Sequence, residues 1–235
     1  MRGLILAIGF MTRLPVPAVK EFDPGQFSAC AKWFPLVGLL VGLVLEAALR
    51  LGSLVDPWFG SLICLIVWIW ITGGLHLDGL ADTFDALGAA HRNRERFLEV
   101  LADPHVGAFG AMGIALQIAT KLVLLMLVPK SGHSWIFLVP AWARWSALSW
   151  ARLPSLKAGL GERFGWNISP ASIWFWGIVL AAASAVSPFL LLAPLAMLAW
   201  RQFLMRLGGM SGDLLGAGIE IVESFCLLLL VASSR

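Results

Sequence analysis

Three aspartates follow one another at helical spacing in the stretch 73–85, whose sequence is GGLHLDGLADTFD. Asp78, Asp82 and Asp85 stand at i, i+4 and i+7, so on a helix they fall within about 60° of one face. Like charges at this spacing repel one another, and no basic residue in the stretch offsets them. A divalent cation would remove the repulsion, and carboxylate oxygens favour Mg²⁺, or Mn²⁺, over Zn²⁺. The three aspartates are therefore the predicted metal ligands, with a solvated acidic helix face as the alternative.

Further residues that could take part in catalysis or binding lie in or near this stretch. His76 directly precedes the acids, and Asp103 follows a run that contains Arg92, Arg94 and Arg96. Guanidinium groups offer forked donors that suit phosphate oxygens. Anchoring of a cytoplasmic loop by positive charge explains the arginines equally well.

A second motif, GGMSGDLLGAGIE, covers residues 208–220. Asp213 and Glu220 are seven residues apart and share a helix face, and Glu223 lies about one turn further on. Carboxylates inside an apolar helix are costly and face a cavity or a partner. Lys121 and Arg144, the basic residues well inside other apolar runs, are the predicted partners. A purely structural neutralisation of these cations by the two glutamates is the alternative.

Composition indicates that these residues are positioned by membrane-spanning helices. Hydrophobic residues make up 59% of the 235 positions, charged residues 13%, and mean hydropathy is +0.85. About 20 apolar residues cross a bilayer, so we expect an all-α polytopic bundle of about seven spans, with six and eight left open. A soluble helix bundle would not have such long apolar runs. The runs are 34–55, 58–75, 106–128, 135–153, 171–186, 189–200 and 214–232.

Three details complete the expected architecture. Leu4–Met11 is read as a short N-terminal interfacial helix, and Ser187-Pro188 between the fifth and sixth runs allows either two spans or a kinked hairpin. Residues 1–235 form one predicted domain. Cys30, Cys64 and Cys226 are isolated and are read as small core residues.

The basic residues predict the topology. With a cytoplasmic N-terminus, most of the 17 lysines and arginines fall on the cytoplasmic side, as does the connection 76–105, and the C-terminus lies outside. The predicted location is therefore a bacterial inner membrane, with the acids facing the cytoplasm. The formal charge of +3 is too small and too dispersed to indicate nucleic-acid binding.

Several separate motifs, in the same order, give the chain a resemblance to the cobalamin synthase family, the adenosylcobinamide-GDP ribazoletransferases. Lys121, Arg144 and the loop 159–161 also resemble positions that the family uses. One departure is His105, where the family resemblance leads us to expect arginine. The matching segments are 12–17 (TRLPVP), 34–38 (FPLVG), 73–85, Asp103 with Gly107, and 208–220.

The resemblance implies a specific reaction. A hydroxyl of α-ribazole, or of its 5′-phosphate, attacks the cobinamide-linked phosphorus of adenosylcobinamide-GDP, and GMP leaves. Phosphoryl transfer of this kind uses a metal ion to spread charge, which agrees with the predicted ligands. The alternatives are a CDP-alcohol-type phosphotransferase of lipid metabolism, by analogy with the Asp-Gly-x-x-Ala-Asp core, and an ion-coupled membrane transporter.

Taken together, these observations assign a role to each candidate residue. The metal ligands are Asp78, Asp82 and Asp85 in a magnesium-dependent site. Asp103 completes the site or acts as general base, and Asp213 binds a second metal or orients the attacking hydroxyl. The expected partners are the two substrates and the lipid bilayer, with a homo-oligomer possible. Phosphate contacts are expected from Arg94 and His76, and the cavity floor from Lys121, Arg144 and Glu220.

Overall fold

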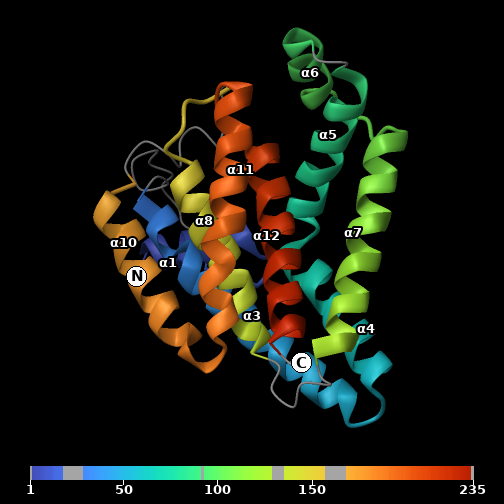
Figure 1. The fold of residues 1–235 in the computed structure, drawn as a ribbon, viewed down its shortest axis with the longest axis vertical. Coiled ribbons are helices and arrows are strands. Elements are labelled where there is room, and N and C mark those ends of the chain that lie inside the picture. The colour runs from blue at the N-terminus through green and yellow to red at the C-terminus, as the bar shows by residue number, and fades with distance from the viewer. Residues whose placement is uncertain (1, 18–28, 91–92, 129–134, 157–167, 234–235) are drawn as a thin grey trace.

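The protein, seen in a computed structural model, is a bundle of helices (Figure 1). The structure describes residues 2–17, 29–90, 93–128, 135–156 and 168–233. Within these ranges the extended pairing consists of an isolated parallel bridge between Ser155 and Met210. The helices are α1 (Arg2–Met11), η1 (Ala31–Trp33), α3 (Phe34–Ser53), α4 (Pro57–Thr72), α5 (Leu75–Ala90), α6 (Arg94–Leu101), α7 (Ala108–Leu127), η3 (Ile136–Leu138), α8 (Val139–Trp150), α10 (Pro170–Ala183), η4 (Ser184–Val186), η5 (Pro188–Leu192), α11 (Ala193–Leu207) and α12 (Gly212–Ala232).

The all-helical polytopic class is confirmed, but the number of spans differs from the seven expected. Among the described residues, four helices are long and apolar enough to cross a bilayer: 31–53, 108–127, 188–207 and 212–232. A fifth span results if the bent pair α4 and α5 is counted as one. Helix α8 has 12 residues, about 18 Å, so it is too short for a hydrocarbon core of about 30 Å. The run 171–186 forms a shorter apolar helix that ends before Ser187, so only its partner, 188–207, meets the length of a span.

The bend between α4 and α5 sets the position of the predicted acids. The two helices meet at 86°, and both linking glycines have left-handed backbones, with φ of 65° at Gly73 and 72° at Gly74. Side chains with a Cβ rarely adopt this conformation, so the double glycine permits the sharp turn. The backbone N–H of Arg13 donates to the carbonyl of Ile71 (2.8 Å), which ties the N-terminal segment to the end of α4. The expected connection 76–105 is therefore a helix packed in the bundle, followed by α6.

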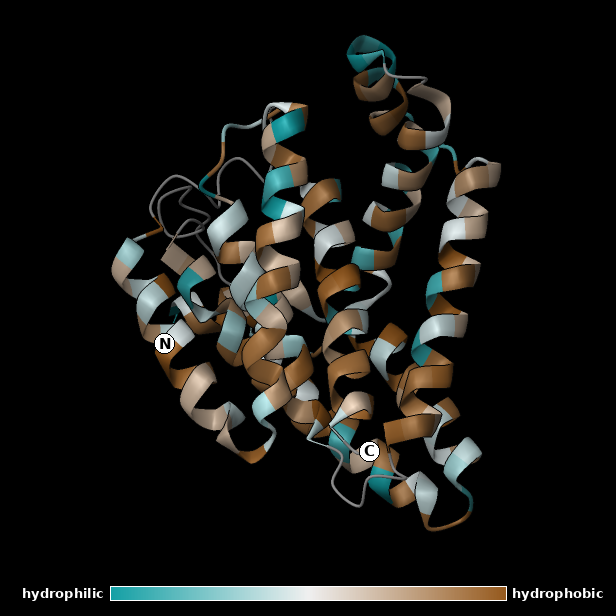
Figure 2. Cartoon of the chain, viewed as in Figure 1, coloured by the Kyte–Doolittle hydropathy of each residue, from teal (hydrophilic) through white to brown (hydrophobic). Residues whose placement is uncertain are grey.

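Polar residues gather at the two ends of the bundle (Figure 2). One end, at the top of the view, carries α6 and the last turns of α11, and brown apolar helices fill the middle. The Nε of Arg94, in α6, donates to the carbonyl of Leu207, the last residue of α11 (3.1 Å). Because α5, α6 and the α11–α12 turn meet at this end, both sequence motifs belong to one region of the molecule.

Candidate active site

Two of the three acids of helix α5 are open to their surroundings. Asp78 is exposed and Asp82 is partly exposed. Leu87, nine residues after Asp78, is 47% exposed and lies about 180° from it around the helix. Leu75, 44% exposed, lies seven residues before Asp82 and so on nearly the same side as the acids. Exposed apolar residues therefore lie on both sides of α5, and what sets the acids apart is the neighbour that each one meets.

The N-terminal turn of α12 lies against the same helix. A Cβ built at Gly79 would stand 2.6 Å from the carbonyl oxygen and 2.9 Å from the Cα of Asp213. Only a residue without a side chain allows this approach. Asp213 sits in the first turn of α12, where the Oγ of Ser211 caps the helix by accepting from Leu214 N–H (3.3 Å). The structure thus brings Asp213 next to the helix that carries Asp78 and Asp82, as the two motifs together predict.

Asp85, the third predicted ligand, faces a different neighbour. Its carboxylate accepts hydrogen bonds from the backbone N–H groups of Gly107 (2.7 Å) and Gly110 (2.8 Å) at the start of α7, and the residue is 8% exposed. Of the three stacked acids it is therefore the one enclosed by protein.

Asp103 and His105 form an exposed pair in the connection between α6 and α7. Asp103 Oδ1 accepts from the backbone N–H of His105 (3.0 Å) and lies 2.7 Å from His105 Nδ1. These two bonds, the backbone one first, hold the pKa of the Asp103 carboxyl below its usual range. Because its proton affinity is lowered, Asp103 is a weaker proton acceptor than an unperturbed aspartate.

Arg94 packs on the glycine turn between α11 and α12. A Cβ at Gly208, whose φ is 91°, would stand 2.9 Å from Arg94 Nη2. On the other side of this turn, Met210 pairs with the segment 154–156 through two backbone hydrogen bonds of 2.8 Å. Residues 157–167 follow directly, so the family-like loop 159–161 lies outside the described residues.

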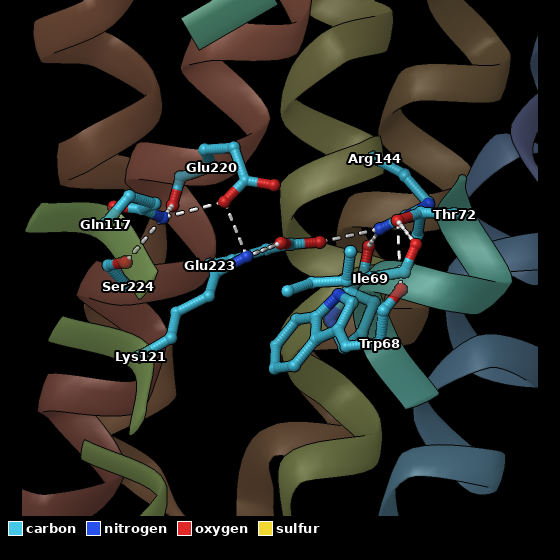
Figure 3. A network of polar contacts seen from close by, with 10 residues as sticks. Trp68, Ile69, Thr72, Gln117, Lys121, Arg144, Glu220, Glu223 and Ser224 are labelled. Carbon is cyan, nitrogen blue, oxygen red and sulfur yellow. Dashed lines mark hydrogen bonds and ion pairs between the residues drawn. The ribbon is translucent and has the colours of Figure 1, made fainter. Parts of the chain in front are cut away.

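Deeper in the bundle, four buried charged side chains form a continuous network of ion pairs (Figure 3). Lys121 Nζ of α7 lies 2.6 Å from carboxylate oxygens of both Glu220 and Glu223 on α12, and Arg144 Nη1 of α8 lies 2.8 Å from Glu223. Gln117 adds hydrogen bonds from its Nε2 to Glu220 Oε2 (2.8 Å) and to the Glu220 carbonyl (2.9 Å). The predicted pairing of the two cations with the two glutamates is confirmed. Two positive and two negative charges balance, which removes most of the cost of burying each one alone.

His76 belongs to this buried region rather than to the acid face. It is 3% exposed, and a Cβ at Gly216 of α12 would stand 3.3 Å from its Cα. Neither of its ring nitrogens has a hydrogen-bond partner among the described residues, and the same holds for Nε and Nη2 of Arg144. His76 lies at the start of α5 and Arg94 lies beyond its end. The side chain of Arg94 contacts the turn between α11 and α12, whereas His76 is enclosed among α5 and α12, so the two residues expected to contact phosphates have different surroundings.

The predicted three-aspartate site is not assembled as a closed ligand cage. Among the residues that the structure describes, no three His, Cys, Asp or Glu side chains converge closely enough to hold a metal ion. The accessible pair Asp78 and Asp82 still suits Mg²⁺. This ion commonly takes one or two protein carboxylates and completes its octahedron with water and substrate phosphate oxygens.

Two participants were missed by sequence reasoning. Gln117 binds Glu220 from α7, and Arg13 lies at the α4–α5 bend, where a Cβ at Gly73 would stand 2.5 Å from its Nε. Two weak signals in the sequence pointed to Gln117. It is an amide within an apolar run, and it lies four residues before Lys121, on the same helix face. Arg13 lies in the family-like segment 12–17, but only the tertiary fold places it at this bend.

The fold and the site define a polytopic all-helical membrane protein in which a carboxylate-bearing face lies beside a buried, charge-balanced network. The profile of the cobalamin-5-phosphate synthase family matches residues 3–231. The chain belongs to this family.

Relatives that match nearly the whole chain are adenosylcobinamide-GDP ribazoletransferases. Adenosylcobinamide-GDP ribazoletransferase of Thiobacillus denitrificans is 52% identical over 97% of this chain and 94% of its own length. The proteins of the same name from Laribacter hongkongensis and Brevibacillus brevis are 52% and 33% identical, each over at least 98% of both chains. No solved structure matches the chain.

Proposed function

We propose that this chain transfers the adenosylcobinamide-phosphate moiety of adenosylcobinamide-GDP to α-ribazole, or to its 5′-phosphate, and releases GMP. This is the step that joins the nucleotide loop of cobalamin. Similarity to ribazoletransferases over essentially the whole chain supports the proposal. The structural observation that carries it is the accessible pair Asp78 and Asp82 on α5, which lies beside the first turn of α12.

The reaction exchanges one phosphorus–oxygen bond for another. The hydroxyl of the ribazole substrate forms a bond to the cobinamide-linked phosphorus, the bond from that phosphorus to the GMP oxygen breaks, and the hydroxyl proton passes to a base. Such transfers depend mainly on positioning and on stabilisation of phosphate charge. Polar residues from α5, α6 and α12 meet at the same end of the bundle, so the chain can hold two substrates there.

Mg²⁺, or Mn²⁺, is the expected cofactor, with Asp78 and Asp82 as the residues that would hold it. Bound there, the ion would neutralise the phosphate oxygens during transfer. Asp213 has the position to orient the attacking hydroxyl, because its backbone contacts α5 at Gly79, between the two acids in sequence. Asp103 would be a weaker general base than an unperturbed aspartate, because its hydrogen bonds with His105 lower its pKa.

The proposed location is a bacterial inner membrane, with the acids on the cytoplasmic side. The α6 end of the bundle carries Arg94, which contacts Leu207, and Arg206 next to that residue. The opposite end, near the loop that contains Asp56, carries Arg50 of α3. Positive charge concentrates on cytoplasmic ends of spans, so the α6 end is the cytoplasmic one in this proposal.

A reconstituted assay tests the function directly. Purified protein in lipid nanodiscs is incubated with Mg²⁺, adenosylcobinamide-GDP and α-ribazole, and GMP and the joined corrinoid are measured. We expect both products in equal amounts. Glu99→Gln, which removes an exposed acid of α6, serves as the matched control for variants in α5.

The alternatives predict other outcomes of the same experiment. A CDP-alcohol phosphotransferase would release CMP from a CDP-activated lipid precursor and leave adenosylcobinamide-GDP intact. A transporter would release no nucleotide but would move an ion across sealed vesicles. The charge balance of the buried network gives transport no particular support, because its two carboxylates are already paired with Lys121 and Arg144.

A further inference from the structure

Asp85 caps a helix that has no cap of its own. Helix α7 begins after Gly107, which carries no side chain to accept from the free N–H groups of the first turn. The two carboxylate oxygens of Asp85, from α5, accept from the N–H groups of Gly107 (2.7 Å) and Gly110 (2.8 Å) instead. A negative group at this end of a helix also complements the helix dipole.

Gly107 and Gly110 leave the space that this carboxylate occupies. A Cβ at Gly107 would stand 2.5 Å from Asp85 Oδ1, and a Cβ at Gly110 would collide with Asp85 Oδ2. Residues with side chains at either position would displace the carboxylate or the helix. The close approach of α7 to α5 therefore depends on Asp85 and on the absence of side chains opposite it.

The three stacked acids thus differ in what surrounds them. Asp78 is exposed and Asp82 partly exposed, whereas Asp85 is 8% exposed and both of its oxygens already bind backbone donors. A metal ion at Asp85 would have to replace these bonds and enter a space occupied by the start of α7. The same helix α7 carries Gln117 and Lys121, which bind Glu220 of α12 in the buried network.

We infer that Asp85 is a positioning residue, which caps α7 and fixes it against α5, and that the metal ligands of the acid face are Asp78 and Asp82. The inference rests on the proposed metal-dependent transfer only for its second part. Its first part concerns the folded chain alone. The two parts therefore need separate measurements.

Hydrogen exchange tests the cap, and Mn²⁺ binding followed by electron paramagnetic resonance tests the ligand. In Asp85→Asn, one amide oxygen replaces two acceptors and the NH2 group opposes a backbone N–H. We therefore expect amides of residues 107–111 to exchange about fivefold faster or more, with Mn²⁺ affinity within about twofold of the parent. Gly110→Ala should accelerate exchange in the same way. Asp82→Asn should leave this exchange unchanged and weaken Mn²⁺ binding by about tenfold or more.

Two results would overturn the inference. One is unchanged exchange at the start of α7 in both Asp85→Asn and Gly110→Ala. The other is weakening of Mn²⁺ binding by Asp85→Asn as large as that by Asp82→Asn. Absence of Mn²⁺ binding in the parent protein would count against the proposed function, and the exchange measurement would still decide the role of Asp85.

Discussion

At the scale of single residues, surroundings rather than residue type separate the roles of the acids. Asp78, Asp82 and Asp85 share one helical face, yet the first two are accessible and the third is buried against α7. Glu220 and Glu223 are buried as well, but they face cations of equal and opposite charge. A carboxylate therefore binds a ligand, caps a helix or neutralises a cation according to the element that it meets.

Asp82→Asn is the sharpest residue-level test of the catalytic face. The substitution keeps the shape of the side chain and removes its charge, so we expect transfer activity to fall by about a hundredfold or more. Repulsion from Asp78 and Asp85 is relieved, so thermal stability in metal-free detergent should equal or exceed that of the parent. GMP release and a thermal unfolding scan measure the two effects, with Glu99→Gln as control. Turnover within a few-fold of the parent at saturating Mg²⁺ would contradict this placement of the catalytic face.

Lys121→Met tests the buried network. The change leaves Glu220 without its cation and leaves Glu223 with Arg144 alone, so we expect a loss of about 3–5 kcal/mol in the free energy of unfolding. Adding Glu220→Gln to this variant should recover part of the loss, because the unpaired charge is removed. Lys32→Met, at an exposed position, is the control and should change stability little. Equal stability of Lys121→Met and Lys32→Met in a denaturant titration would show that the network does not stabilise the fold.

At the scale of elements, the crossing of α5 and α12 holds the two sequence motifs together. Gly79 permits contact with the backbone of Asp213, and Gly216 permits contact with the backbone of His76. The bend at Gly73-Gly74 turns α5 by 86° from α4, which directs its acids away from the line of the preceding helix. The geometry of the site thus depends on glycines that carry no chemistry themselves.

Gly79→Val tests this crossing. Its side chain would have to push Asp213 away from α5, so we expect a loss of about 1–3 kcal/mol in stability from overpacking. We also expect a loss of activity larger than this destabilisation explains, because displacement by about 1 Å impairs positioning. Gly212→Ala is the control, since a Cβ there meets nothing within 4 Å. Activity and stability of purified variants are compared, and a Gly79→Val protein with parental turnover would refute the role of the crossing.

At the scale of the whole molecule, the proposed orientation rests on the positive charges at one end of the bundle. The end with α6 contains Arg94 and Arg96, and helix α5 runs toward this end (Figure 1). The opposite end contains the loop between α3 and α4, where Asp56 caps α4.

Labelling of single cysteines tests this orientation in a background without Cys30, Cys64 and Cys226. A membrane-impermeant maleimide should label Asp56→Cys in intact cells and Glu99→Cys only after the membrane is opened. Both positions are exposed, so reactivity differs through sidedness and not through burial. Labelling of Glu99→Cys from outside intact cells would invert the orientation.

The sequence alone determined the membrane class, the helical stacking of the three acids and the pairing of Lys121 and Arg144 with the two glutamates. These follow from composition, from a period of 3.6 residues and from the cost of unpaired charge in an apolar helix. Tertiary structure changed the number of candidate spans among the described residues, because hydropathy does not reveal that α8 has only 12 helical residues or that α4 and α5 form one bent pair. It also decided the surroundings of His76 and Asp85. Helical spacing places a side chain on a face, but only the neighbouring helix determines whether that face meets solvent, a buried network or the N–H groups at the start of α7.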